Sequence, residues 1–365
     1  VLQRQSQATK GFLLQTSILN RLSGSLCDAV RFDSTETPSS SKGTAVTGQN
    51  SGQAILENLE AANLFIVPLD NERRWYRYHH LFADLLRQRL HENEPDHIPE
   101  LHRRASEWYA QKDMPSDAIR HALAAEDFER VADLAELVRQ DMDNSFQSAA
   151  WLGWVKMLPD EMIRNRPVLS AQYAWALMNG GEMELAEARL QDAERWLNPT
   201  GDMSEQNRRM VVVDEEQFQS LPATIANARS YHTQALGDIS GSVEYAELAL
   251  KLTPEEDLIG RAQATVSLGF TQWASGDLEA AHRGMADWIN SMQKAGNIVF
   301  AIASAFALAD IMVAQGILHE AVRTYKRSLQ LASEHDKHVQ RVISHLYLGL
   351  AMLHHEMGNQ EAAAQ

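Results

Sequence analysis

Five histidines near the C-terminus are the side chains in this sequence that most resemble a set of metal ligands. Their spacing does not give the pair four residues apart that helical zinc sites use, and no acidic ligand completes the set. We therefore predict no metal site and expect these histidines to line solvent-facing surfaces. They are His335, His338, His345, His354 and His355.

Motifs of nucleophilic, metal-assisted or phosphate chemistry are missing. The sequence contains no H-E-x-x-H, no G-x-S-x-G and no G-x-x-x-x-G-K-[ST]. Ser39-Ser40-Ser41-Lys42 fits S-x-x-K, but it lies within 33–52, a stretch rich in Ser, Thr and Gly with few large apolar residues. Such a stretch is expected to be a mobile loop that cannot hold a nucleophile's partner in place. The sequence predicts no catalytic residue, and it predicts that no nucleotide binds to this chain alone.

The overall charge argues against direct binding of nucleic acid. The net charge is −16 and the pI is near 5.3, whereas affinity for duplex DNA depends largely on Lys and Arg. A locally basic zone lies between 73 and 104, but acidic residues are interspersed in it. We expect this zone to be an interdomain surface. Its arginines are Arg73, Arg74, Arg77, Arg87, Arg89, Arg103 and Arg104.

The remaining bulk features predict a soluble cytoplasmic protein. Cys27 is the only cysteine, which excludes an internal disulfide and suits a reducing compartment. No apolar run is long enough to cross a bilayer, and no signal peptide is visible. Because the sequence begins at Val1, we expect a piece of a longer or processed chain. Its 365 residues exceed one typical compact domain.

The elements that position these residues are mostly helical. Gly and Pro are sparse while Ala, Leu, Glu and Gln recur, which predicts a predominantly all-α fold. Two helices separated by a Ser-Gly break are expected over 12–30, and single helices are expected over 53–63 and 80–90. Between them, 65–69 and 75–78 flank a polar run as in a short β-hairpin, with Pro68 marking an edge strand. This order predicts a winged-helix module over residues 1–95.

Residues 96–365 are predicted to form helical hairpins that repeat. Five glycines that could end helices are each followed, five residues later, by a small residue, and the last three intervals between them are 39, 40 and 42 residues. A period near forty indicates stacked helix pairs of the tetratricopeptide type rather than an irregular bundle. The pairs are Gly181 with Ala186, Gly237 with Ser242, Gly276 with Ala281, Gly316 with Ala321, and Gly358 with Ala363.

The repeat register also predicts a groove. In tetratricopeptide arrays the first helix of each pair lines the concave face, where aromatic platforms and a few polar groups could stack on a sugar ring or grip a peptide. The alternative is that these aromatic side chains belong to the core. The predicted groove residues are Trp175, Tyr231, Phe270, Trp273, Asp310 and His355.

Three stretches carry a resemblance to a known family. FLLQTSILNRLSG with LCDAV, ANLFIVPLD with RRWYRYHHLFADLLRQRL, and ELHRRASEWY with DAIRHALAAEDFERVADL resemble the MalT family of ATP-dependent, LuxR-type transcription regulators. The match covers most of 11–138 and continues more loosely through the repeats. The resemblance implies a winged helix followed by a superhelical sensor domain.

The same resemblance implies parts outside this chain. Such regulators have an N-terminal ATPase domain and a C-terminal DNA-binding helix-turn-helix, and inducer with ATP drives their oligomerisation. Neither part occurs in this sequence. We therefore expect no cofactor in this chain and ATP or ADP only in a parent protein, with a small-molecule inducer or a regulatory protein as partner. We expect no membrane partner and no direct contact with nucleic acid.

One histidine acquires a role through the resemblance. His79 matches the histidine of a Met-His-Asp motif that contacts nucleotide phosphates in related ATPases, although His80 stands where the acid is usual. A histidine can donate a hydrogen bond to phosphate. The alternative is that His79 caps the junction between hairpin and helix. The leading hypothesis is a sensor segment that relays effector binding, ahead of a protein-binding scaffold and of a DNA-binding winged-helix protein.

Overall fold

The computed structural model of the chain describes residues 5–32, 51–145, 147–197, 210–335 and 340–360. Helices dominate these residues, whose sheet structure is one antiparallel pair of strands, so the prediction of a predominantly all-α fold is confirmed. The chain divides into two compact units, Val1–Leu134 and Ala135–Gln365. Most of the predicted loop at 33–52 lies outside the described residues, as do residues 198–209 between two of the repeat glycines.

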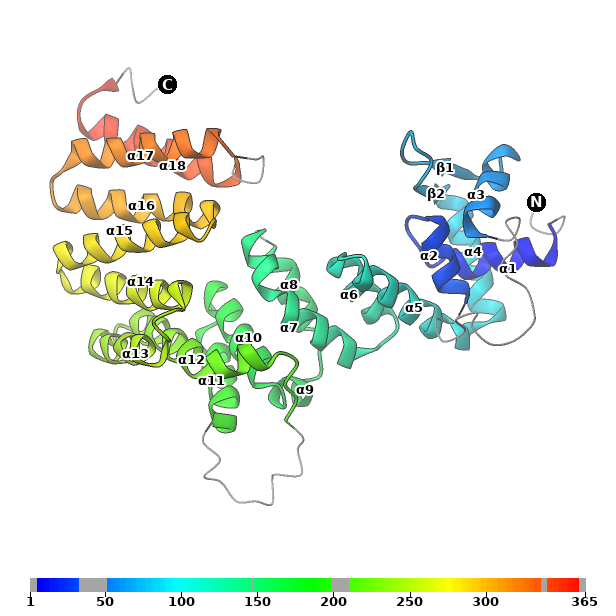
Figure 1. Cartoon of the computed structure of the whole chain (residues 1–365), viewed down its shortest axis with the longest axis horizontal. Helices are drawn as coiled ribbons and strands as arrows, with labels where there is room; N and C mark the ends of the chain where they lie inside the picture. The colour runs from blue at the N-terminus through cyan, green and yellow to red at the C-terminus, as the bar shows by residue number, and fades with distance from the viewer. Residues whose placement is uncertain (1–4, 33–50, 146, 198–209, 336–339, 361–365) are drawn as a thin grey trace. The chain divides into compact units, whose positions relative to one another are not determined.

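The first unit has the order of elements predicted for a winged helix (Figure 1). Three helices precede a hairpin, and a fourth helix follows it directly. Helix α7 (Phe128–Asn144) contains the boundary between the two units. The elements before it are α1 (Gln7–Thr16), α2 (Gly24–Arg31), α3 (Gly52–Ala61), β1 (Ile66–Pro68), β2 (Tyr76–Tyr78), α4 (His80–Asn93), the 3-10 helix Pro95–His97, α5 (Ile98–Gln111) and α6 (Pro115–Ala124).

Serine residues begin the first three helices. The side chains of Ser6, Ser23 and Ser51 each accept a hydrogen bond from the backbone N–H three residues later, which satisfies an otherwise unpaired donor at each helix start. The apolar faces of these helices meet in one core, in which Phe12 and Leu56 are fully buried. The buried apolar area stabilises the module.

The hairpin pairs as its sequence predicts. Ile66 lies opposite Tyr78 and Pro68 lies opposite Tyr76. Leu22 forms a bridge to the other side of Tyr76, so β2 is the inner strand and β1 is the edge. Pro68 therefore lies where its missing N–H costs no ladder hydrogen bond. The Tyr78 hydroxyl lies 2.7 Å from Thr16 Oγ1 and ties the hairpin to α1.

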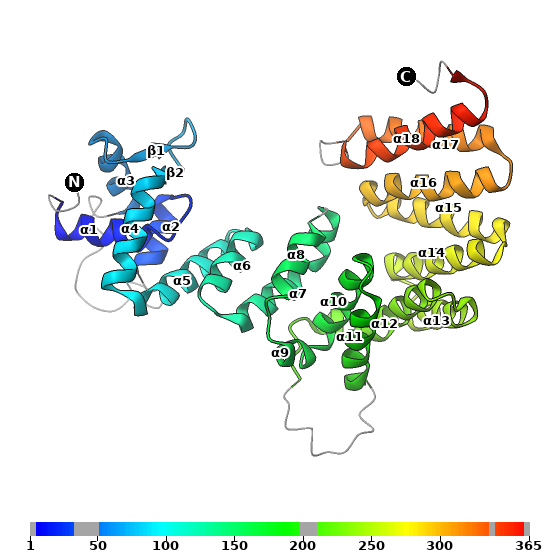
Figure 2. The ribbon, with the colours of Figure 1, turned by 180° about the vertical axis from the view of Figure 1, so that it is seen from behind.

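The described residues of the second unit form helices and no strands. Its later helices stack on one another in chain order, and Figure 2 shows the same order from behind. The helices are α8 (Ser148–Val155), α9 (Asp160–Arg164), α10 (Pro167–Asn179), α11 (Met183–Leu197), α12 (Glu215–Ala235), α13 (Ile239–Leu252), α14 (Leu258–Ser275), α15 (Leu278–Lys294), α16 (Ile298–Ala314), α17 (Leu318–Ser333) and α18 (Gln340–Glu356).

The predicted repeat is confirmed in its backbone. The five repeat glycines follow α10, α12, α14, α16 and α18, and each has a positive φ, from 75° at Gly358 to 90° at Gly276. Glycine adopts this left-handed conformation without a Cβ clash. The small partner residues are fully buried where the second helix of each pair meets the first, and they are Ala186, Ser242, Ala281 and Ala321. Ala363 lies outside the described residues.

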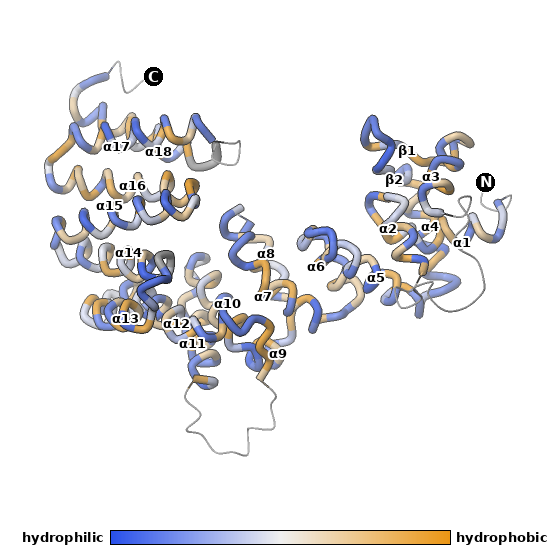
Figure 3. Tube along the Cα trace, in the orientation of Figure 1, coloured by the Kyte–Doolittle hydropathy of each residue, from blue (hydrophilic) through white to orange (hydrophobic). Residues whose placement is uncertain are grey.

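Polar bonds reinforce the stack in its middle. Ser242 of α13 lies within hydrogen-bond distance of Ser230 of α12, at 3.1 Å, and of Thr271 of α14, at 2.8 Å, with all three hydroxyls buried. These hydroxyls join three consecutive helices. Figure 3 shows polar residues interspersed with apolar ones along the helices. In the part of the chain that the structure describes, no helix combines the length and apolar character needed to cross a membrane.

Candidate functional site

The predicted groove residues all lie on the first helices of the hairpins, and the structure brings four of them together in two pairs. The ring of Trp175 on α10 lies 5.7 Å from that of Tyr231 on α12. On α14, the rings of Phe270 and Trp273 lie 6.4 Å apart. Asp310 lies on α16, and exposed His355 lies on α18.

Two adjoining cavities open between these first helices, and together we call them the groove. One has a volume of about 530 Å³ and the other about 780 Å³. Trp175 lines the smaller cavity, whereas the other five predicted groove residues line neither. The two cavities share the side chains of Gln140, Ser220, Thr224, Asn227 and Gln263.

Helical periodicity explains why these side chains face one space. On α12 the lining residues recur every three or four positions, which places them along one stripe of the helix. Tyr231, four residues after Asn227, continues this stripe beyond the cavities. The lining residues on α12 are Gln217, Ser220, Leu221, Thr224 and Asn227 in the smaller cavity.

Two amide side chains give the groove its chemical character. Asn227 is only 4% exposed, and its Oδ1 has no hydrogen-bond partner. Gln172 of α10 donates through Nε2 to the backbone oxygen of Glu136 at 3.1 Å and to Gln217 Oε1 at 2.9 Å, while its Oε1 is buried and has no partner. A buried acceptor without a partner costs free energy. Because both oxygens are buried behind the cavity wall, a ligand could pair with them only after the two side chains rotate toward the groove.

One charged pair also lines the smaller cavity. Arg139 of α7 is 7% exposed, forms an ion pair with Asp143 and lies over the ring of Trp151 at 4.5 Å. Burial lowers the pKa of Arg139, and Asp143 opposes that shift. The charges of the pair cancel locally, so the groove does not present a free cation here.

Asp310 and His355 belong to other surroundings. Burial raises the pKa of Asp310, and burial together with Asp310 raises the pKa of Tyr325 to about 12. Among the described residues no group of three or more His, Cys, Asp and Glu is arranged to hold a metal ion. His338, one of the five C-terminal histidines, lies outside them.

His79 occupies the N-cap position of α4. Its backbone N–H donates to Phe65 O at 2.7 Å, but its side chain makes no capping hydrogen bond. The imidazole is exposed and lies 4.4 Å from the ring of His80, measured between ring centres. The backbone thus fixes the junction of hairpin and helix while the side chain is accessible to a ligand.

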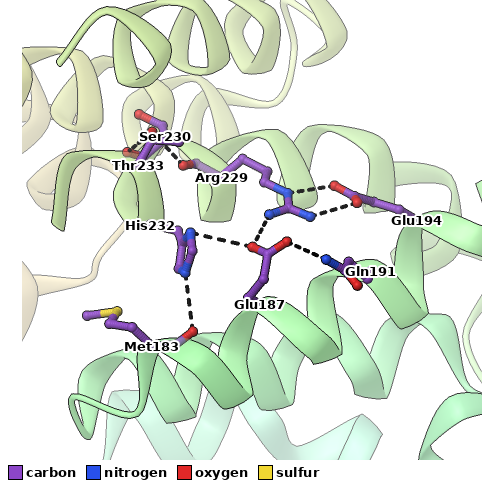
Figure 4. A network of polar contacts seen from close by, with 8 residues as sticks. All are labelled: Met183, Glu187, Gln191, Glu194, Arg229, Ser230, His232 and Thr233. Atoms are coloured by element: carbon purple, nitrogen blue, oxygen red, sulfur yellow. Dashed lines mark hydrogen bonds and ion pairs between the residues drawn. The ribbon is translucent and has the colours of Figure 1, made fainter. Parts of the chain in front are cut away.

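A polar network beside the groove locks α11 to α12. Arg229 of α12 donates to both oxygens of Glu194, each at 2.7 Å, and also bonds Glu187 (Figure 4). His232 Nε2 lies 3.2 Å from the backbone oxygen of Met183. Hydrogen bonds to Glu194 and Glu187 raise the pKa of Arg229, although burial opposes this shift. Burial also opposes the shift at Glu187, where hydrogen bonds from Arg229 and Gln191 lower the pKa. The network holds the groove-lining face of α12 in position.

Sequence reasoning missed the amide and guanidinium groups of the groove. Gln172 lies three residues before Trp175, and Asn227 four before Tyr231, so both share a stripe with a predicted residue. The same helical spacing could have pointed to them. Arg139 precedes the repeat register altogether, because α7 lies before the first repeat glycine.

Comparison with known proteins gives two matches to protein families. Residues 1–98 match the MalT winged helix domain, and residues 223–365 match the MalT-like TPR region. Both agree with the elements described above. The second match includes α14, α16 and most of α12, which line much of the groove.

Several solved structures match this chain. A Signal Transduction ATPase with Numerous Domains (STAND) protein with a tetratricopeptide repeat sensor, from Pyrococcus horikoshii, matches with a TM-score of 0.62 and 13% identity over 100% of this chain and 50% of that chain. BtubC from P. vanneervenii matches at 0.42 with 14% identity, over 65% of this chain and 87% of that one. Aspartyl phosphate phosphatase F from Bacillus subtilis matches at 0.40 with 9% identity, over 99% and 92%.

These findings define the class of protein first. It is a winged helix joined to an array of TPR-like helical hairpins, and it spans half the length of the STAND protein whose fold it shares. The chain belongs to the MalT family, as the sequence resemblance predicted.

Proposed function

We propose that this chain is the regulatory segment of a LuxR-type, MalT-like transcription regulator, with the groove as its effector site. The effector is a small molecule or a protein. Its binding is relayed through the winged helix to an ATPase domain and a DNA-binding domain, which are parts of the parent protein. The parent acts in the cytoplasm, binds ATP or ADP in its ATPase domain and self-associates when active.

One observation carries the proposal: the groove contains buried acceptors that have no partner within the chain. Asn227 Oδ1 and Gln172 Oε1 both line the smaller cavity. Protein interiors pair nearly all such atoms, so each unpartnered acceptor calls for an explanation, and here two of them belong to side chains that line one cavity. Helix α7, which supplies Arg139 to the groove, begins in the unit that contains the winged helix. Because this single helix continues from the first unit into the second, it could transmit the effect of effector binding toward the winged helix.

A thermal-shift screen of the purified chain tests this function. Sugars, amino acids, nucleotides and short peptides would be added singly, and each ligand that raises the unfolding temperature would be tested again on variants. We expect Trp175→Ala to abolish the shift, whereas Arg77→Ala, an exposed change on β2, leaves it intact. Ligands whose shift survives Trp175→Ala and disappears in Arg77→Ala would place the effector site on the winged helix instead.

A second candidate function is a scaffold that binds a protein partner without nucleotide coupling. Helix α18 favours it, because Tyr347, Leu348 and Met352 are 56%, 58% and 57% exposed. Large apolar side chains gathered on one helix commonly mark a protein contact. Replacing all three by Ser would separate the two functions: a scaffold loses its partner, whereas an effector site in the groove keeps its ligand.

A further inference from the structure

A third cavity, with a volume of about 290 Å³, lies within the first unit and is separate from the groove. It is bounded by residues that follow α1 and by helices α4, α5 and α6. Ile18, Leu90 and Ile98 form an apolar part of its wall. No Asp or Glu is among its described lining residues, whereas both cavities of the groove include an aspartate.

Two guanidinium groups line this cavity from two different helices. Arg87 of α4 donates through Nε to the backbone oxygen of Ser17 at 2.9 Å, which holds its side chain in place. Arg120 of α6 is the second. After burial, the charges of Arg120 and Arg87 are the causes that lower the pKa of His102. Both positive charges therefore act on one side chain of the cavity wall.

The neighbouring carboxylates offset these charges only in part. Arg87 pairs with Asp84, which is 68% exposed, so solvent screens that pair strongly. Asp117 is shared between Arg120, at 2.6 Å, and Arg21, at 2.8 Å. Two guanidinium groups thus share a single carboxylate, and neither aspartate lines the cavity. The cavity wall therefore has an excess of positive charge.

The pair of histidines adds a hydrogen-bond donor to this wall. His102 Nδ1 and His121 Nδ1 lie 2.8 Å apart, so one ring donates to the other. His121 Nε2 is buried without a partner, and because unpaired buried N–H groups are rare, we assign the His121 proton to Nδ1. His102 then has its proton on Nε2. Since His102 is the partly exposed member of the pair, this N–H is the one that a ligand could meet.

We propose that this cavity binds a small organic anion, whose phosphate or carboxylate group accepts hydrogen bonds from Arg87, Arg120 and His102. Guanidinium groups are planar donors whose geometry matches anionic oxygens. The apolar part of the wall would pack against a short hydrocarbon part of the ligand. The inference goes beyond the proposed function, because it gives the first unit a ligand site of its own.

Calorimetry on the full chain, at constant ionic strength, tests the ligand class with four probes. Butyl phosphate and butyrate share a hydrocarbon part and differ in the anionic group, so their relative affinities distinguish phosphate from carboxylate. Inorganic phosphate lacks the hydrocarbon part, and 1-butanol lacks the charge. We expect at least one of the two organic anions to bind more tightly than inorganic phosphate and 1-butanol. An absence of measurable binding by both organic anions, or tighter binding of 1-butanol, would overturn the proposal.

Arg120→Gln tests the role of the guanidinium groups. The Arg120 side chain is 47% exposed, so the variant should keep its fold while it loses the charge. We expect about tenfold weaker binding of the organic anion, as loss of a hydrogen bond to a charged group predicts. Arg89→Gln is the matched control, because Arg89 of α4 pairs with Glu92 outside the cavity, and it should bind like the wild type.

A second variant adds a negative charge instead of removing a positive one. Ala124 of α6 is exposed and lines the cavity, so Ala124→Glu should repel the anion and weaken binding about tenfold. Ser116→Glu makes the same change at an exposed position on the same helix, roughly 12 Å away along its axis, where salt screens it, and should have little effect. Affinities that are equal in the wild type, Arg120→Gln and Ala124→Glu would overturn the proposal.

Hydrogen exchange with and without the tightest-binding anion locates the site. We expect slower exchange in α5, α6 and the C-terminal half of α4, with no change in α10, α12 and α14. Protection in these three groove helices, with none in the first unit, would place the anion in the groove and overturn the inference.

Discussion

A pair of histidines in the first unit shows how burial changes the chemistry of single residues. His102 Nδ1 and His121 Nδ1 lie 2.8 Å apart, and the ring of His121 stacks on Tyr109 at 5.4 Å. Burial, assisted by Arg120 and Arg87, lowers the pKa of His102 to about 4. Burial, His102 and Arg120 lower that of His121 to about 3. The folded chain therefore holds both imidazoles neutral.

This pair predicts a loss of stability in mild acid. Their ordinary pKa is 6.5, so the unfolded chain takes up these protons at a higher pH than the folded chain does. The stability that they contribute is complete above pH 6.5 and falls as the pH drops toward 4, by about 1.4 kcal/mol per pH unit for each proton. Urea unfolding of the first unit, followed from pH 7.5 to 4.5, measures this slope.

Two variants give that measurement its controls. His121→Phe should reduce the slope between pH 6.5 and 4.5, because a phenyl ring keeps the stack on Tyr109 and binds no proton. His355→Phe, a change at an exposed histidine on α18, should leave the slope of the first unit unchanged. Equal slopes in the wild type and His121→Phe would contradict the account.

The amides of the groove mark the limit of prediction from sequence at this scale. Trp175 could be placed on the groove from the repeat register, and it lines the smaller cavity. Whether Asn227 has a partner depends on which side chains of α10 and α14 reach it after folding. Single-sequence reasoning does not contain that information, because both helices are distant from Asn227 along the chain.

At the scale of elements, the contact between α11 and α12 depends on Arg229. Arg229→Met keeps the length of the side chain but leaves Glu187 and Glu194 without their cation. Because both carboxylates are about a third exposed, we expect a loss of about 1–2 kcal/mol rather than the larger value of a fully buried pair. Chemical denaturation of the second unit measures it.

Arg323→Met is the matched control for this loss. Arg323 pairs with Glu320 on the surface of α17 and is 69% exposed, so its removal should change the stability by less than about 0.5 kcal/mol. An equal effect of the two variants would show that the network in Figure 4 does not join the helices.

The repeat glycines predict opposite effects for two similar substitutions. Gly276 has φ 90°, so Gly276→Ala forces a strained backbone and should cost about 1 kcal/mol. Gly153 lies inside α8, where an added Cβ meets nothing within 4 Å, so Gly153→Ala should stabilise by about 0.5–1 kcal/mol. Thermal unfolding of both variants checks the signs. Stabilisation by Gly276→Ala would contradict the left-handed helix end.

The elements themselves were largely predictable from the sequence. A glycine followed five residues later by a small residue reports a helix end and a close helix contact, and both features are local in the chain. The hairpin at 65–78 was equally accessible, because alternating strands flank a polar turn. The interval between Gly181 and Gly237 departs from the period of forty, and part of it lies outside the described residues.

At the scale of the whole molecule, each of the two units has a different role in the proposed regulator. In that proposal, His79, which is exposed on the winged helix, would contact nucleotide in the parent protein, and the groove of the TPR-like unit would bind the effector. The net charge of −16 disfavours direct contact with duplex DNA, so the signal would leave this segment through protein contacts.

The central claim is that the groove is the effector site. Hydrogen exchange, measured by mass spectrometry with and without a ligand from the thermal-shift screen, tests it most directly. A ligand in the groove should slow exchange in α10, α12 and α14, with the strongest protection around Asn227, because ligand binding suppresses local opening. Protection confined to α18 or to the first unit, with none in these three helices, would contradict the groove as the effector site.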